Sequence, residues 1–207
     1  MPIGITSQQV ADSIGSGLAR AVVVAKIDGN LTDLNNPLEK DCALELFTGD
    51  TPEGHDTLLH STAHLMAQAV KELFPDTKVT IGPTIENGFF YDFDVDVAFS
   101  DEVLAKIEQK MKVLAKSGQE IVRQEMSAGD AVKMFNDMGE PYKVEIISQI
   151  NPEDVISAYT QRDFTDLCRG PHVSNTKKIK YFKLLSTSGA YWRGDEKNKM
   201  LQRIYGT

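Results

Sequence analysis

The sequence contains little cysteine and no long hydrophobic stretch. Cys42 and Cys168 are the two cysteines among 207 residues, and their wide separation argues against a disulfide framework. No apolar run approaches the ~20 residues that a membrane-spanning helix needs. The first residues also lack the charged-then-apolar pattern of a signal peptide. These absences argue against a disulfide-rich secreted domain and against membrane-spanning helices, and they predict a cytoplasmic protein.

Bulk composition is ordinary for a folded domain. The chain is 41% hydrophobic and 25% charged, as is typical of globular rather than disordered proteins. Its net charge of −8 generally disfavours a nucleic-acid partner. Near the C-terminus, however, basic residues alternate with aromatic ones and could follow a phosphate backbone. This basic stretch comprises Lys177, Lys178, Lys180, Lys183, Arg193, Lys197, Lys199 and Arg203. Taken alone, it is better explained as a solvated rim.

Residues 1–50 are expected to form a small α+β module. Ser7 can cap a short helix that ends at Gly15-Ser-Gly17. A β-branched run over 22–27 predicts a strand, and the dipeptide Asp28-Gly29 after it is a strong hairpin signal. Residues 44–47 predict another strand. The segment 49–54, which contains glycine and proline, predicts a hinge to the rest of the chain.

Residues 51–207 are expected to form a larger α+β unit. Apolar residues at helical spacing predict a helix over 55–73, which Pro75 stops. An aromatic-rich strand is predicted over 89–94, and Ser100 can cap a long helix. A strand over 121–125 and a helix over 127–138 follow. The remaining residues predict short strands and turns, with 182–185 and 201–205 as candidate strands.

Two pairs of metal-ligand side chains, each pair separated by three residues, are the most informative feature. They are His60 with His64, and Cys168 with His172. On a helix this spacing places both members of a pair on one face. Together the four side chains would provide either a tetrahedral zinc site or an acid–base pocket without metal. A hydrogen-bonded core position is the commoner explanation for a single histidine, but two such pairs weaken it.

Neighbouring residues restrict the chemistry. Ser61 stands where a zinc metalloprotease carries its glutamate base, and a structural zinc site favours several cysteines rather than one. Asp166 could orient an imidazole or hold a substrate amine. Lys143 lies among apolar and aromatic residues, although composition alone favours a surface lysine. Arg169 could bind a phosphate or a carboxylate.

Four strings in this sequence match a known family. They are His60-Ser-Thr-Ala-His64-Leu65, Ile81-Gly-Pro-Thr-Ile-Glu-Asn-Gly-Phe-Phe-Tyr-Asp-Phe-Asp94, Asp163-Phe-Thr-Asp-Leu-Cys-Arg-Gly-Pro-His-Val173, and Phe182-Lys-Leu-Leu-Ser-Thr-Ser-Gly-Ala-Tyr-Trp-Arg-Gly-Asp195. Over essentially its whole length the chain closely resembles the N-terminal region of bacterial threonyl-tRNA synthetases. The resemblance implies a ubiquitin-like β-grasp (TGS) domain over 1–50, without its first hairpin. It also implies an α+β editing domain of the threonyl/alanyl-tRNA synthetase type over 51–207.

The resemblance also implies how the chain relates to a longer enzyme. The family continues beyond residue 207 into the core that attaches threonine to its tRNA using ATP. We therefore expect a fragment that lacks aminoacylation activity, because the ATP site and the zinc of the synthetic site belong to that core. The fragment is expected to be monomeric, and the parent enzyme homodimeric.

The implied function is proofreading. Serine lacks one methyl group of threonine, and a pocket discriminates one methyl by only ~1–3 kcal/mol. A second pocket that hydrolyses seryl-tRNA(Thr) would supply the missing selectivity. The resemblance implies an editing set of His60, His64, Lys143, Asp166, Cys168 and His172. In this hypothesis Lys143 and His60 activate water, Asp166 binds the substrate ammonium, and the remaining three line the pocket.

The expected partner is the acceptor end of tRNA(Thr) carrying serine, with no membrane and no cofactor. Related alanyl-type deacylases carry the same two pairs, and the resemblance implies that they bind zinc. A zinc-dependent deacylase that uses His60, His64, Cys168 and His172 is therefore the first alternative. A non-catalytic tRNA-binding module that uses the basic stretch is the second, and an inactive fragment is the third.

Overall fold

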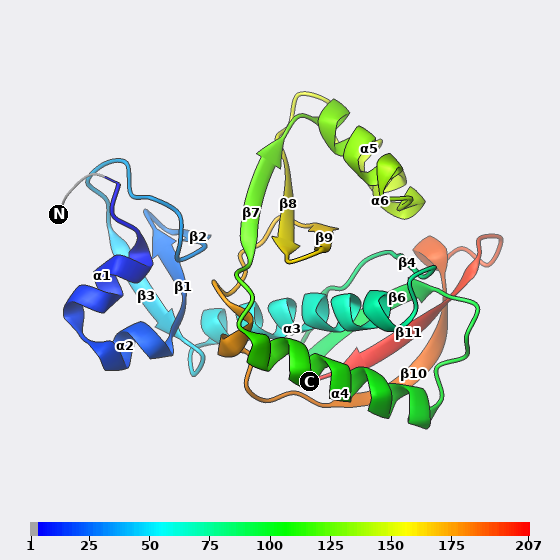
Figure 1. The fold of residues 1–207 in the computed structure, drawn as a ribbon. Coiled ribbons are helices and arrows are strands. Elements are labelled where there is room, and N and C mark those ends of the chain that lie inside the picture. Colours follow the sequence, from blue (N-terminus) through cyan, green and yellow to red (C-terminus); the bar gives the residue numbers. More distant parts are fainter. Residues whose placement is uncertain (1–3) are drawn as a thin grey trace.

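The computed structural model describes residues 4–207, which form a small N-terminal body and a larger body (Figure 1). Both bodies combine helices with strands, so the predicted α+β class is confirmed. Within residues 4–207, no helix is both long enough and apolar enough to cross a membrane.

The N-terminal body packs two short helices on an antiparallel sheet. Its elements are α1 (Ser7–Ile14), α2 (Ser16–Ala21), β1 (Val22–Ile27), β2 (Asn30–Thr32) and β3 (Leu44–Thr48), and its described strands lie in the order β2-β1-β3. Asp28 and Gly29 form the predicted two-residue turn with φ values of 48° and 85°, because a type I′ hairpin turn needs positive φ at both positions. The small core contains Ala11, Val22, Ala25 and Leu34.

The start of α1 differs from the prediction. Thr6 rather than Ser7 is the N-cap. Its hydroxyl accepts a bond from the Gln9 N–H at 3.2 Å, and the Gln9 side chain accepts the Thr6 N–H at 2.9 Å. This reciprocal capping box satisfies two helix donors at once. Gly15 ends α1 as predicted, but α2 begins at Ser16, where no helix was expected.

The larger body is built around α3 (Pro52–Leu73). The Thr51 hydroxyl accepts the Gly54 N–H at 3.2 Å and so caps the helix, and Pro52 occupies the first turn, where its missing N–H has no consequence. The helix therefore begins three residues earlier than predicted. The prediction of a hinge over 49–54 is wrong in its second half, because residues 52–54 are helical.

An antiparallel sheet lies against α3. Its elements are β4 (Lys78–Val79), β5 (Thr84–Ile85), β6 (Gly88–Asp94), β10 (Leu184–Tyr191) and β11 (Met200–Gly206), in the order β10-β11-β6-β4 with β5 also on β6. Helix α4 (Asp101–Ser117), capped by Ser100 as predicted, packs beside α3 (Figure 1). Strand β10 extends well beyond the predicted 182–185. The prediction stopped short because residues 186–189 are exposed, small and polar, and so show no apolar alternation.

A second small sheet completes the larger body. Its elements are β7 (Val122–Met126), α5 (Ala128–Asp137), α6 (Pro141–Ile147), β8 (Ile156–Gln161) and β9 (Phe164–Leu167), with strand order β7-β8-β9. Helices α5 and α6 pack on this sheet through Phe135, Ile147 and Ile156. The sequence predicted turns where α6 lies. The missed signal was Pro141, which starts the helix at its first position.

Candidate functional site

The fold brings all six predicted site residues together. His60 and His64 lie one turn apart on α3, Lys143 on α6 and Asp166 on β9, and Cys168 and His172 lie in the segment that follows β9. An open cleft of about 1040 Å³ is lined by five of them, whereas His172 is only 1% exposed and packs behind Cys168. His172 was expected to line the pocket, and the structure places it behind the side chains that do so. It supports the pocket wall from behind.

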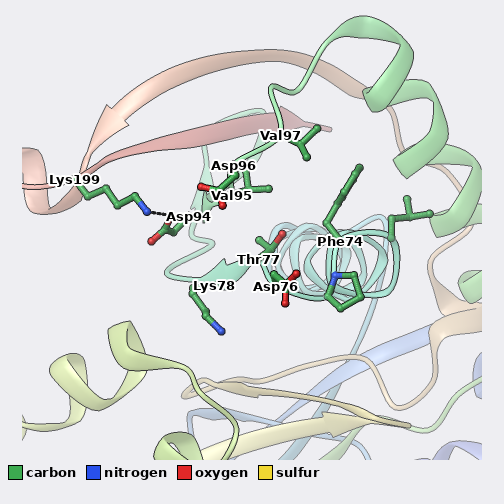
Figure 2. Close-up of a pocket in the computed structure, with 11 residues that line it drawn as sticks. Phe74, Asp76, Thr77, Lys78, Asp94, Val95, Asp96, Val97 and Lys199 are labelled. Carbon is green, nitrogen blue, oxygen red and sulfur yellow. Dashed lines mark ion pairs between the residues drawn. The ribbon is translucent and has the colours of Figure 1, made fainter.

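A smaller cavity of about 400 Å³ lies at the C-terminal end of α3 (Figure 2). Residues 73–78, residues 94–97 and Lys199 line it, and Lys199 forms an ion pair with Asp94 beside the opening. The predicted site residues lie elsewhere, so the larger cleft is the candidate site.

Cys168 and His172 meet in a turn rather than on a helix. A cis peptide bond joins Gly170 to Pro171 within this turn, and the Gly170 N–H donates to Cys168 Sγ at 3.2 Å. The sulfur lies 3.2 Å from His60 Nε2 and 3.2 Å from His172 Nε2. The two predicted pairs thus converge, but the helical explanation holds only for His60 and His64.

Ser61 determines which nitrogen of His172 carries the proton. Its hydroxyl donates to the Thr57 carbonyl at 2.8 Å and accepts the Val173 N–H at 3.0 Å. Because a hydroxyl has one proton to donate, its 3.1 Å contact with His172 Nδ1 requires the imidazole to be the donor. The Nε2 lone pair of His172 therefore faces the Cys168 thiol. From the sequence, Ser61 was used only to argue against a zinc metalloprotease, and its hydrogen bond with His172 was not predicted.

The histidine and cysteine side chains form an uncharged wall at neutral pH. Burial lowers the pKa of His60 below its usual 6.5. It lowers the pKa of His64 and His172 much further, and the neighbouring imidazoles add to the effect. Burial raises the pKa of the Cys168 thiol to about 12. Desolvation of this kind disfavours every charged form, so the wall consists of a thiol and neutral imidazoles.

A buried ion pair stands beside this wall. Lys143 contacts Asp166 Oδ1, and the two side chains are 2% and 1% exposed. The Tyr91 hydroxyl donates to Asp166 Oδ2 at 2.6 Å, and Lys143 donates to the Tyr91 oxygen at 3.1 Å and to the Thr80 carbonyl. His64 Nδ1 lies 3.6 Å from the same carboxylate. The interpretation of Lys143 as a surface lysine is therefore wrong.

Glu140 holds the helix that carries Lys143. Its buried carboxylate accepts Lys71 Nζ at 2.7 Å and the Val79 N–H at 3.0 Å, and so ties the start of α6 to α3 and β4. Neither Glu140 nor Tyr91 was predicted as part of the site. Tyr91 lies inside a string that was quoted for its family likeness, but nothing in the sequence alone assigned it a contact.

Structural bonds account for much of the basic stretch. Lys183 pairs with Glu108, Arg193 with Glu145, Lys199 with Asp94 and Arg203 with Asp92. The Lys178 ammonium donates to three carbonyl groups at the end of α2, those of Ala19, Arg20 and Val22. The four ion pairs neutralise part of the stretch, and the Lys178 bonds link the two bodies of the protein.

Two known protein-domain families match the chain, one in each of its two bodies. A TGS domain model matches residues 1–48, and the model described as "Threonyl and Alanyl tRNA synthetase second additional domain" matches residues 156–205. The chain therefore contains segments similar to both of these tRNA-synthetase domains.

The particular similarity is to threonine–tRNA ligases, whose N-terminal region the chain matches. It is 56% identical over 207 residues to the threonine–tRNA ligase of Geobacter sp. (strain M21) and 56% identical over 207 residues to that of Citrifermentans bemidjiense. It is 53% identical over 206 residues to that of Anoxybacillus flavithermus. In all three comparisons 100% of this chain aligns with 32% of the relative, so the chain spans about a third of the length of these curated relatives.

Proposed function

We propose that the cleft hydrolyses the ester that joins misattached serine to tRNA(Thr), as the proofreading site of a threonine–tRNA ligase. The observation that carries this proposal is the buried Lys143–Asp166 pair, which lies at an open cleft beside the neutral imidazole of His60. The cleft therefore combines a cation, a carboxylate and a proton acceptor. We further propose that the chain acts in the cytoplasm, as a monomer, on the acceptor end of this tRNA.

In the proposed reaction Lys143 and His60 position the attacking water. The water oxygen forms a bond to the ester carbonyl carbon while a water proton moves to the His60 imidazole, which is unprotonated because burial lowers its pKa. The bond from the carbonyl carbon to the ribose oxygen then breaks, and His60 returns the proton to that oxygen. The Lys143 ammonium stabilises the negative charge that develops during the attack.

Asp166 would bind the substrate ammonium in this scheme. A carboxylate has about four acceptor sites, and Tyr91 and Lys143 occupy only part of that capacity. His64 and Cys168 form the adjoining wall of the cleft. His172 acts one layer deeper, because it orients the Cys168 thiol.

The test compares release of serine and threonine from tRNA(Thr) charged with each amino acid. We expect serine to be released faster by about 10–200-fold, the range that one methyl group supports. Spontaneous hydrolysis of each ester without protein is the control. Equal rates for the two amino acids would refute a proofreading function, and so would release no faster than the spontaneous rate.

The four ligand-type side chains favour a second candidate, a zinc-dependent deacylase. One nitrogen or sulfur atom from each of His60, His64, Cys168 and His172 lies within 4.8 Å of the others. This donor set could hold a zinc ion that acts as a Lewis acid. The two sulfur–nitrogen distances of 3.2 Å are, however, shorter than the ~3.6 Å that tetrahedral zinc bonds would impose. We therefore propose that the site works without metal.

Elemental analysis distinguishes these two candidates. In protein purified without chelator we expect zinc far below one ion per chain, and treatment with a chelator should leave the serine-release rate unchanged. Stoichiometric zinc whose removal abolishes hydrolysis, and whose return restores it, would establish the zinc-dependent mechanism instead.

A further inference from the structure

Asp33 of the N-terminal body reaches the back of the candidate site. It follows β2, its side chain is buried, and both of its carboxylate oxygens bond to groups of the larger body. Oδ1 accepts the backbone N–H of His172 at 2.8 Å, and Oδ2 accepts the hydroxyl of Tyr159 at 2.8 Å. Because both partners belong to the larger body, this carboxylate can hold the two groups at a fixed position relative to each other.

Tyr159 transmits this contact to the Cys168–His172 turn. Its ring lies 4.4 Å from that of His172, centroid to centroid, and its hydroxyl lies against Gly170. A Cβ atom on Gly170 would come within 1.9 Å of the tyrosine oxygen, and φ is +73° there, so only glycine fits. The bond from the Tyr159 hydroxyl to Asp33 fixes this oxygen against the turn.

This turn places the Cys168 sulfur between the His60 and His172 imidazoles. We propose that Asp33 is a positioning residue of the editing cleft, because it holds the Cys168–His172 turn through the His172 N–H and the Tyr159 hydroxyl. This inference rests on the proposed deacylase function and extends it, since it makes the N-terminal body part of the site's support.

Burial disfavours the charged form of Asp33. Burial raises the pKa of this carboxyl group, and its two hydrogen bonds oppose the shift without cancelling it. The charged form is therefore held in the folded protein at an energetic penalty.

The test uses the full chain and measures kcat and KM for serine release from seryl-tRNA(Thr). Asp33→Ala leaves the His172 N–H without its acceptor and frees the Tyr159 hydroxyl. We expect kcat to fall by about 10–100-fold, the range for a small misplacement of reacting groups, while KM changes by less than ~3-fold. Asp33→Asn keeps an acceptor for the His172 N–H and a partner for Tyr159, and should restore kcat to within ~3-fold of the unmodified chain.

Tyr159→Phe tests the same arrangement without replacing the carboxylate. It keeps the ring against His172 but removes the hydroxyl, and kcat should fall by about 3–10-fold, since one buried hydrogen bond is lost. Lys178→Met is the matched control. It cuts another polar link between the two bodies, the bonds to the Ala19, Arg20 and Val22 carbonyls, and should leave kcat unchanged.

The outcomes separate this inference from the function on which it rests. Serine release by the unmodified chain tests the function itself. If the unmodified chain is active, an unchanged kcat in Asp33→Ala or in Tyr159→Phe overturns the positioning role. An equal loss of kcat in Lys178→Met also overturns it, because loosening of the two bodies would then suffice. If Asp33→Ala does not fold, the kcat of Tyr159→Phe decides.

Discussion

Replacement of Lys143 by alanine is expected to reduce serine release from seryl-tRNA(Thr) by about 10²–10³-fold, as loss of one preorganised charge donor does in other enzymes. The Lys143 ammonium contacts Asp166 and bonds to Tyr91 and the Thr80 carbonyl deep in the cleft. Its removal leaves the Asp166 carboxylate buried and unpaired. The free energy of unfolding should therefore also fall, by about 3–5 kcal/mol. Single-turnover kinetics and urea unfolding measure the two effects.

A double variant separates catalysis from stability in this prediction. Lys143→Met combined with Asp166→Asn removes both charges, so much of the lost unfolding free energy should return while serine release stays slow. Lys133→Ala, an exposed lysine on the neighbouring helix α5, is the matched control and should behave as the unmodified chain does. Recovery of activity in the double variant would contradict a catalytic role for Lys143.

Replacement of His60 by alanine is expected to slow serine release by about 10²–10⁴-fold, the usual contribution of a general base. His60 is half-buried in the middle of α3, and alanine is the best helix former, so the fold should be retained. His55→Ala, at an exposed position five residues earlier on the same helix, is the matched control. Single-turnover rates that agree between His60→Ala and the control would exclude His60 as the base.

The pH dependence gives His60 a signature of its own. Burial lowers the pKa of His60 below 6.5, so its imidazole is unprotonated and able to accept a proton throughout the neutral range. The enzymatic rate, after subtraction of spontaneous ester hydrolysis, should be flat above pH 6.5 and decline only below it, as His60 becomes protonated. In His60→Ala this acid decline should disappear. A rate that rises tenfold per pH unit through neutrality would identify hydroxide as the nucleophile instead.

The local signals in the sequence were sufficient for most of the fold. Asp28-Gly29, Ser100 and Pro75 each govern the backbone within a few residues, and the hairpin, the cap and the helix end lie where these residues predict them. Helix α6 and the extended β10 were missed. For α6 the local signal, Pro141 at the first position, was overlooked, and the later residues of β10 are small and polar and show no apolar alternation.

The sequence predicted which residues form the candidate site, but not how they are arranged in space. His60 and His64 follow from helical spacing, whereas Cys168 meets its partners through a turn, and Lys143 is buried because Glu140 fixes its helix. Asp33 carried no signal at all, since its two partners lie more than a hundred residues away. Long-range contacts of this kind are visible only once the fold is known.

The order of strands has a consequence for how this chain is made. Central strand β6 has β11 as its neighbour on one side, and β11 ends at Gly206, one residue before the last. While a ribosome is still producing residues 95–199, β6 has an open edge that can pair with other chains. Contacts between such distant segments also form slowly. We therefore expect the nascent polypeptide to depend on chaperones until β11 emerges, and the cleft to be assembled only after synthesis has passed His172.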